Sequence, residues 1–302
     1  MLVFAASDKG GTGRSVTSCN IAYRLSLMGN DVAYVDFDFG SPTAGAIFEI
    51  SKVERGTTEG GLHSYIEGDI GDPRQVDVRL DSDRPGLRAV QPKAGRLVLF
   101  PGNHGGAEFP SRPERVNRCV DLFRRIEQEF DICMVDLSAG RSHAVHMVLT
   151  ATARDELQSA ARWLVFHRWT RQHIMAAHGL IFGEHGLLDV GAEGGHDPHG
   201  LLESIRSVRT AVPDLNSPLT TDRPTQAKWL HTCNEELKRL ARDNKLGYSM
   251  TLGSTPMEPV LQWREQVISD TDLSGNIANT ATADSFSDLA RKLTDEETWE
   301  VV

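Results

Sequence analysis

Short runs of apolar residues alternate along most of this chain with longer segments in which apolar residues recur every three or four positions. The short runs have the length and the β-branched or aromatic content of buried strands, and the longer segments have the period of helices that bury one face. Such an alternation predicts an α/β fold: a mostly parallel central sheet with helices on both faces, a Rossmann-like three-layer sandwich. The expected strands are residues 1–6, 32–36, 96–100, 130–136, 162–166, 205–212 and 248–252, and the expected helices are residues 15–28, 115–129, 144–152, 169–182, 225–244 and 284–293.

Several segments interrupt this alternation. Residues 39–50 are typical of a loop that leads into a short apolar helix, residues 70–95 of a polar, exposed excursion, residues 218–224 of a loop and residues 294–302 of an acidic tail. Residues 183–200 combine many glycines with His185, His196 and His199. A flexible surface insertion is favoured there over a metal site, because the histidines lack a fixed helical spacing. The whole chain, residues 1–302, is expected to form a single domain.

Composition narrows the class of protein. The chain has 302 residues, 39% of them hydrophobic, and a net charge of −10 at pH 7, which argues against a surface that grips nucleic acid as a whole but leaves room for a local basic patch. No apolar run approaches the roughly 20 residues that span a bilayer, and no signal peptide is recognisable, so we expect a cytoplasmic protein. The cysteines fit buried free thiols better than a zinc or redox site, because they stand far apart at positions 19, 119, 133 and 233.

A glycine-rich loop, Asp-Lys-Gly-Gly-Thr-Gly-Arg-Ser at residues 8–15, follows the first expected strand. Its glycines lack Cβ atoms, so the backbone can turn several N–H groups toward one anion, and the start of the next helix adds a partial positive charge. Strand, loop and helix in this order predict a site for the phosphates of a nucleotide. The residues expected around the phosphates are Gly10, Gly11, Thr12, Gly13, Arg14, Ser15 and Val16.

Arg14 stands where the usual phosphate loop has a lysine. That lysine reaches the β- and γ-phosphates, and the hydroxyl after it, here Ser15, holds magnesium. A guanidinium group keeps the charge but is planar and donates in a fixed fork, so nucleotide binding can survive while the geometry of phosphoryl transfer suffers. A second departure is Lys9, which comes before the glycines.

The order lysine, glycines, basic residue and hydroxyl resembles the deviant Walker A loop of the ParA/MinD family, P-loop ATPases that dimerise around ATP. The resemblance implies the fold of a P-loop NTPase and the cofactors ATP and Mg²⁺. It implies that Lys9 crosses a homodimer interface to the partner's phosphates and that Ser15 holds magnesium. Asn20 falls where the family has an asparagine, whereas Val16 replaces a hydroxyl that the family places at the α-phosphate.

Aspartates end two of the expected strands. Asp36-Phe37-Asp38 matches an Asp-x-Asp of the family, which implies that Asp38 orients the attacking water and approaches magnesium while Asp36 supports the site. Asp136 ends a buried run with the form of a Walker B strand, whose carboxylate holds a magnesium-bound water or the hydroxyl of the loop. The catalytic residues implied are therefore Lys9, Arg14 and Asp38, and the metal-binding residues are Ser15, Asp38 and Asp136.

Further resemblances extend along the chain. Residues 61–69 resemble a short helix and turn of MinD-like proteins, and residues 137–140 resemble the second switch of the family. The segment with Pro256 resembles the family's loop near the adenine, and ATP is preferred over GTP because no guanine-reading motif is present. Family members that bind iron–sulfur clusters are not indicated, since the required cysteines are missing. Membrane binding is not expected, because the last segment is acidic rather than a basic amphipathic helix.

Two hypotheses on function follow. The first is an ATP-switched homodimer that positions or partitions a cellular cargo through an unknown protein partner. The second is a nucleotide-binding scaffold or regulator with little or no hydrolysis, which Arg14 motivates. Non-specific DNA binding stays open, because the sequence does not tell whether the basic residues form one patch or point apart: Arg168, Arg171, Arg206, Arg209, Arg239, Arg242 and Lys245.

Overall fold

The computed structural model describes residues 1–89, 92–157, 160–215 and 223–300. Its strands are β1 (Leu2–Ala6), β2 (Val32–Phe37), β3 (Val76–Asp77), β4 (Leu97–Phe100), β5 (Ile132–Leu137), β6 (Ala161–Arg168), β7 (Ile205–Val212) and β8 (Thr251–Pro256). They form one sheet in the order β3-β4-β2-β5-β1-β6-β7-β8. Neighbours run parallel except β3, which is antiparallel to β4. The predicted mostly parallel α/β sheet is confirmed.

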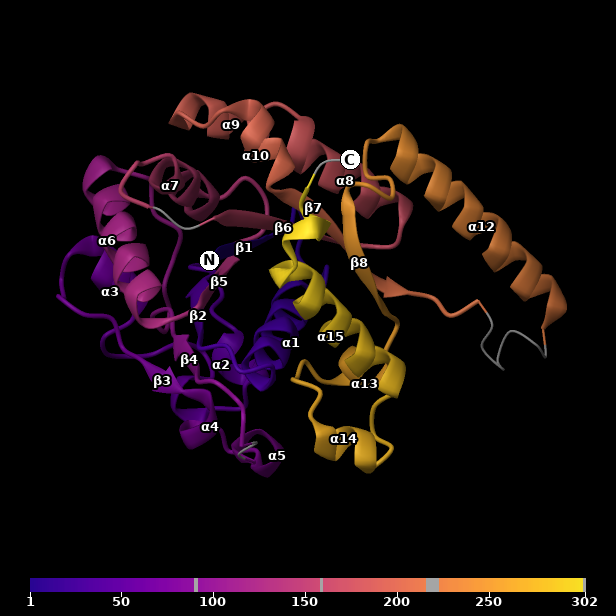
Figure 1. Ribbon diagram of the computed structural model, residues 1–302, viewed down its shortest axis with the longest axis horizontal. Helices are drawn as coiled ribbons and strands as arrows, with labels where there is room; N and C mark the ends of the chain where they lie inside the picture. Colours follow the sequence, from indigo (N-terminus) through magenta and orange to yellow (C-terminus); the bar gives the residue numbers. More distant parts are fainter. Residues whose placement is uncertain (90–91, 158–159, 216–222, 301–302) are drawn as a thin grey trace.

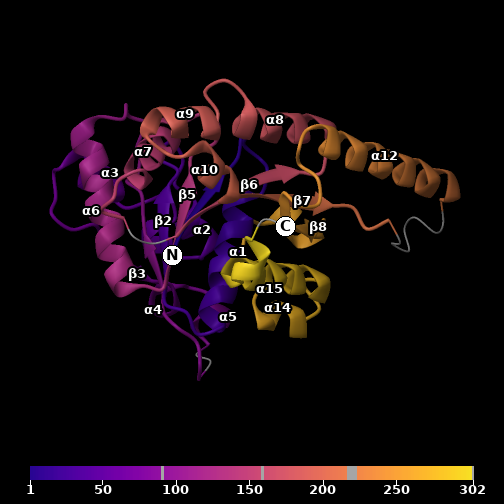
Figure 2. The ribbon, with the colours of Figure 1, turned by 45° about the horizontal axis from the view of Figure 1, so that its top comes forward.

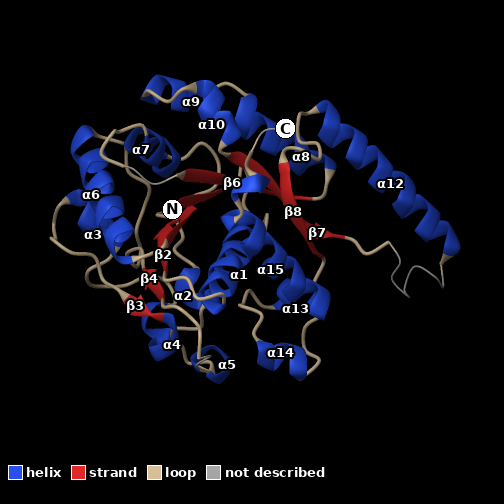
Figure 3. Cartoon of the chain, in the orientation of Figure 1, coloured by secondary structure: helices blue, strands red, loops and turns tan. Residues whose placement is uncertain are grey.

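Helices cover both faces of this sheet (Figures 1 and 2). One layer holds α1 (Arg14–Leu27), α2 (Ala44–Ile47), α4 (Val78–Asp81), α5 (Pro85–Arg88), α13 (Pro259–Trp263), α14 (Asp270–Ser274) and α15 (Thr280–Thr294). The other layer holds α3 (Leu62–Glu67), α6 (Pro113–Glu129), α7 (His143–Thr152), α8 (Arg171–Phe182), α9 (Leu187–Gly194), α10 (Pro198–Glu203) and α12 (Pro224–Asp243). Figure 3 shows the sheet as a red band between the two blue layers.

The strand β1 lies inside the sheet because all its residues are apolar, so that both of its faces can be buried. On one face, Phe4 stacks against Trp163 of β6, with ring centroids 4.6 Å apart. On the other face, Val3 and Ala5 belong to a buried cluster that includes Ile21 of α1. This packing fixes the carboxyl end of β1, and hence the start of the glycine loop, at the middle of the sheet.

Two segments expected to be irregular contain helices. Residues 183–200, expected to be a flexible surface insertion, include α9 and the start of α10. A side chain at Gly191 would collide with Leu201, so this glycine permits a close approach of the two helices rather than a loop. Within residues 70–95, the described part holds β3, α4 and α5, and it buries Val76, Val78 and Leu87.

The end of the chain also differs from expectation. Trp299 of the acidic tail is 9% exposed, and the guanidinium groups of Arg162 and Arg206 both pack over its ring. The last strand begins at Thr251 and ends at Pro256, later than expected. Most of the loop expected at residues 218–224 lies outside the described residues.

The helix α12 extends away from the body of the molecule at its amino end (Figure 1). Near its middle, α12 is bonded to the rest of the molecule. Trp169, which directly follows β6, donates a hydrogen bond from Nε1 to Oδ1 of Asn234 in α12, 2.9 Å away. Trp229 of this helix is 64% exposed. Among the described residues, no helix combines the length and the apolar character needed to cross a bilayer.

Candidate functional site

The glycine loop joins the carboxyl end of β1 to the start of α1 and wraps that helix end. Gly11 and Gly13 have φ angles of 72° and 75°, in the left-handed region that favours glycine. Thr210, at the end of β7, donates a hydrogen bond from its hydroxyl to the carbonyl oxygen of Thr12, 2.5 Å away. This bond from β7 helps to hold the loop in its curved form.

A cleft of two parts lies over this loop. One part, of about 170 Å³, is lined by residues 9–16 together with Asp38 and Glu265. The other part, of about 260 Å³, is lined by Gly11, Thr210 and Pro256 among others. The two parts share lining residues from the loop and Glu265. A hollow at a helix start that adjoins a second hollow matches the needs of a polyphosphate joined to a base.

Arg14 is buried beneath this cleft, with 6% of its surface exposed. Its Nε atom donates to Asp136 Oδ1 at 2.5 Å, and its Nη2 atom donates to Asp38 Oδ2 at 2.8 Å. Burial alone would lower the pKa of this guanidinium, but the charges of Asp136 and Asp38 raise the pKa above its ordinary value. Arg14 is therefore a permanent cation between two carboxyl groups.

The predicted aspartates converge because parallel strands end at the same edge of the sheet. Asp36 of β2 and Asp136 of β5 are paired residues of the two neighbouring strands. Asp36 accepts hydrogen bonds from the backbone N–H groups of Asp38 and Ala44, at 3.3 and 3.1 Å. Burial raises the pKa of Asp36 well above its ordinary value, and the charge of Asp136 adds to this effect. Asp36 thus holds the start of the loop after β2 in place.

The pKa of Asp38 is also raised, because burial outweighs the opposing attraction of Arg14. The side chains assigned to magnesium, namely Ser15, Asp38 and Asp136, offer a hydroxyl and two carboxylates, the oxygen donors that Mg²⁺ prefers. Within the described residues, Asp136 Oδ2 is buried without a hydrogen-bond partner. The donor set therefore fits a magnesium ion in its chemistry, although Arg14 now bonds to members of the same set.

Lys9, unlike Arg14, lies on the exposed side of the glycine loop. The side chain of Lys9 is exposed to solvent at the rim of the cleft, whereas the side chain of Arg14 is buried in the interior. The loop thus presents one cation inward to its own carboxylates and one outward.

Asn20 lies one turn and a half into α1 and is fully buried. Its side-chain amide donates to the carbonyl oxygen of Gln266 at 3.0 Å, and its side-chain oxygen accepts from the N–H of Ile268 at 2.8 Å. The side chain of Asn20 therefore bonds to the backbone of residues 266 and 268 as a neighbouring strand would. These bonds fix the segment that carries Glu265, which lines the cleft.

All the predicted nucleotide-binding residues line the cleft, with residues 10–16 in the first part and Pro256 in the second. Of the predicted metal-binding residues, Ser15 and Asp38 line the cleft, and Asp136 lies buried beside Arg14. Sequence reasoning missed several lining residues that lack a motif, although a place near the end of β7 could have signalled the first two of them: Thr210, Ala211, Gln262 and Glu265.

The histidines of residues 183–200 and some of the basic candidates do not line the cleft. Among the described residues, no group of three or more His, Cys, Asp or Glu side chains is arranged to hold a metal ion. Of the basic residues that were considered as one patch, Arg206 packs on Trp299 and Arg209 packs on Trp169, so these two serve the fold.

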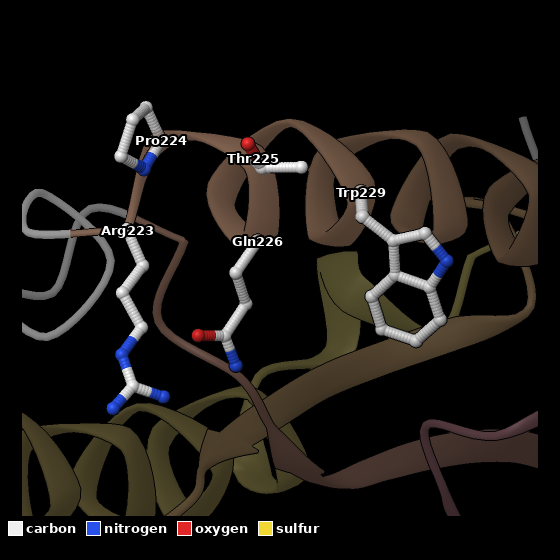
Figure 4. A pocket seen from close by; sticks show the side chains of 5 residues that line it. All are labelled: Arg223, Pro224, Thr225, Gln226 and Trp229. Atoms are coloured by element: carbon white, nitrogen blue, oxygen red, sulfur yellow. The ribbon is translucent and has the colours of Figure 1, made fainter.

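A separate hollow, of about 520 Å³, lies along the amino end of α12. In Figure 4, Arg223, Gln226 and Trp229 extend from the same side of that helix. None of its lining residues belongs to the cleft over the glycine loop.

The chain is similar in fold to several solved structures. It superposes on a chain of the MinC:MinD cell division protein complex of Aquifex aeolicus with a TM-score of 0.57 and 17% identity, covering 100% of this chain and 97% of that one. A putative plasmid partition protein of Borrelia burgdorferi bound to AMPPNP gives 0.59 and 13%, covering 96% of each chain. The septum site-determining protein MinD of Pyrococcus horikoshii, complexed with Mg-ADP, gives 0.56 and 13%, covering 100% and 99%.

A curated relative is an uncharacterised ATP-binding protein of Methanocaldococcus jannaschii, 22% identical over 151 residues, which are 49% of this chain. The chain spans about half of that relative's length, since the match covers 49% of it. A family model described as the CobQ/CobB/MinD/ParA nucleotide binding domain matches residues 3–295. This match covers nearly the whole chain, and with the glycine loop and the convergent aspartates it places the chain in the CobQ/CobB/MinD/ParA family of nucleotide-binding proteins.

Proposed function

We propose that this chain is a P-loop ATPase that dimerises on binding ATP and uses hydrolysis to switch the positioning or partitioning of a cellular cargo. The observation that carries the proposal is the cleft itself, in which the glycine loop, an exposed Lys9 and Asp38 come together above the buried carboxyl group of Asp136. Membership of a family that includes MinD and ParA supports it.

In this proposal the backbone N–H groups of residues 10–16 hold the α- and β-phosphates, with the start of α1 adding its partial positive charge. The second part of the cleft takes the adenine beside Pro256. Lys9 is exposed at the rim of the cleft, so its ammonium group can reach the phosphates bound by a second copy of the chain. ATP then joins two chains because each chain completes the charge balance of the other's site.

Asp38 lies at the edge of the phosphate part of the cleft and is the group placed to orient the attacking water. Burial raises the pKa of Asp38, so its carboxylate is a stronger proton acceptor than an exposed aspartate. A magnesium ion held by Ser15, Asp38 and Asp136 would supply neutralisation of the phosphate charge. A nucleotide-binding scaffold without hydrolysis is less favoured, because the carboxylates of Asp38 and Asp136, which an ATPase needs, lie beside the glycine loop.

The test measures ATP hydrolysis and molecular mass in the same samples, with ATP and magnesium present. We expect slow turnover and a mass that doubles with ATP. Asp38→Ala should abolish turnover, and Lys9→Ala should leave a monomer. The matched control is Asp72→Ala, because the Asp72 side chain is 90% exposed and pairs with Arg125. Arg125 lies in the second half of α6, which leads into the start of β5, and the strands start at the sheet edge opposite the cleft.

A mass that ATP does not change would contradict the dimerising switch, and turnover unaffected by Asp38→Ala would contradict the assigned site. The role in positioning has its own readout. A fluorescent fusion of the chain should redistribute in cells in a way that Lys9→Ala abolishes, whereas an even distribution for both proteins would speak against this role.

A further inference from the structure

The bonds of Arg14 involve the same side chains that were assigned to a metal ion. Its guanidinium contacts Asp136 Oδ1 through Nε at 2.5 Å and Asp38 Oδ2 through Nη2 at 2.8 Å. The Nη2 atom also lies 3.3 Å from Ser15 Oγ, and Nη1 lies 3.5 Å from Ser7 Oγ. All three nitrogens of the guanidinium are therefore bonded to protein groups on the carboxylate side of the loop.

The charges explain what this arrangement does. Two ionised carboxylates beside a triphosphate would repel it, and a P-loop site ordinarily relieves this repulsion with a divalent metal ion. Here one positive charge already stands between the two negative charges, which reduces their sum from −2 to −1. The group is 6% exposed, so the low-dielectric surroundings strengthen its pairing with the carboxylates and exclude competing solvent ions.

The choice of arginine over lysine matters for the same reason. A lysine ammonium is a compact charge on a flexible stem, and it can leave the carboxylates to lie between the phosphates. The planar fork of Arg14 bonds both carboxylates at once, and leaving them would break two buried ion pairs together. The guanidinium is held on the carboxylate side in this structure, and we expect it to stay there when nucleotide binds.

We propose that Arg14 is the resident cation of this site, and that the chain binds ATP nearly as tightly without a divalent metal ion as with one. The proposal rests on the proposed function only in taking ATP as the ligand. Binding then depends on the backbone of the glycine loop and on Lys9, which is exposed at the rim of the cleft and in the proposed function reaches the phosphates bound by a second copy. A requirement for metal is confined to the chemical step.

The experiment titrates ATP into the full chain by calorimetry, once with excess magnesium and once with excess EDTA. For the unchanged chain we expect the two dissociation constants to agree within about threefold. For Arg14→Lys we expect ATP binding in EDTA to be weaker than in magnesium by about tenfold or more, because the ammonium group no longer holds both carboxylates.

Two controls separate this effect from damage to the fold. Arg162→Lys changes another buried arginine that pairs with a carboxylate, Glu296, at the other end of β6, and it should behave like the unchanged chain. Lys9→Ala should weaken binding equally in both buffers. If Arg14→Lys does not fold, the unchanged chain decides the matter alone.

The outcomes are distinct. A loss of tenfold or more when EDTA replaces magnesium in the unchanged chain overturns the proposal while leaving the ATPase function intact. Absence of ATP binding in both buffers refutes the proposed function, and the inference with it. Equal binding in both buffers for the unchanged chain, with a metal requirement in Arg14→Lys, supports Arg14 as the resident cation.

Discussion

Arg141 Nη1 donates a hydrogen bond to Asp8 Oδ1 across 3.0 Å, and so joins the loop after β5 to the first residue of the glycine-loop motif. The same guanidinium donates from Nη2 to the carbonyl oxygen of Gly179 near the end of α8, at 2.8 Å. The neighbouring Gly140 donates its N–H to the carbonyl oxygen of Ser7 at 2.7 Å. The loop after β5 is therefore bonded both to the phosphate loop and to α8.

This connection predicts the effect of Arg141→Met. We expect the free energy of unfolding to fall by about 1 kcal/mol, because the ion pair is partly exposed. We expect a larger effect on ATP-dependent dimerisation, measured by light scattering over a range of protein concentrations. The matched control is Arg96→Met, which removes a similarly exposed pair with Asp31 at the start of β2. Equal loss of dimerisation in both variants would contradict a coupling role for Arg141.

A second prediction concerns the rate of hydrolysis. Arg14→Lys should raise kcat by about tenfold, which corresponds to roughly 1.4 kcal/mol of transition-state stabilisation, because a compact ammonium can lie between the β- and γ-phosphates. The measurement is steady-state release of phosphate in saturating ATP and magnesium, with Arg162→Lys as the control. An unchanged or lower kcat for Arg14→Lys would mean that the arginine is adapted to the chemical step.

A third prediction addresses the segment over the cleft. Asn20→Ala removes both bonds to the backbone of residues 266 and 268, and it leaves a buried carbonyl and a buried N–H unpaired. We expect the free energy of unfolding in urea to fall by about 2–4 kcal/mol, with weaker ATP binding. Asn30→Ala removes a single bond to the carbonyl oxygen of Leu25 and should have a smaller effect. Similar losses in the two variants would argue against a special role for Asn20.

The fourth prediction follows from His167, which is 1% exposed and whose Nε2 atom has no hydrogen-bond partner within the described residues. Burial lowers its pKa from 6.5 to about 4, so the folded chain keeps this side chain neutral while the unfolded chain takes up a proton. Its contribution to stability is therefore complete above pH 6.5 and is lost as the pH falls toward 4.

The measurement compares the unchanged chain with His167→Gln in urea unfolding at a series of pH values. Across the window from pH 6.5 to about 4, the unchanged chain should lose about 3 kcal/mol more than the variant. His104→Gln, at an exposed position, is the control and should follow the unchanged chain. Parallel curves for the unchanged chain and His167→Gln would show that this histidine does not carry the acid sensitivity.

Much of the site could be predicted from sequence because its parts are local or follow from topology. The glycine loop needs only adjacent residues, and Asp38 and Asp136 meet because parallel strands end at one edge of the sheet. The bonding of Arg14 to Asp136 could not be predicted, because it joins residues 122 positions apart and depends on which way a long side chain turns.

The helices α9 and α10 show why part of the fold was missed. Glycine in a sequence indicates either a loop or a close approach between elements, and local patterning does not separate the two. At Gly191 the close approach holds, since Leu201 occupies the space where a side chain would lie. Likewise, the acidic composition near the end of the chain gave no indication that Trp299 packs against Arg162 and Arg206.

The place of β1 within the sheet has a consequence for how the protein is made. Leu2 pairs with Cys133 on one side and with Ala161 on the other, so this apolar strand has no partner until about half of the polypeptide has left the ribosome. The cleft is completed later still, when Pro256 and Glu265 arrive. A nascent chain therefore carries an exposed aggregation-prone strand and cannot use nucleotide to stabilise itself, which makes early protection by chaperones an expected feature of its synthesis.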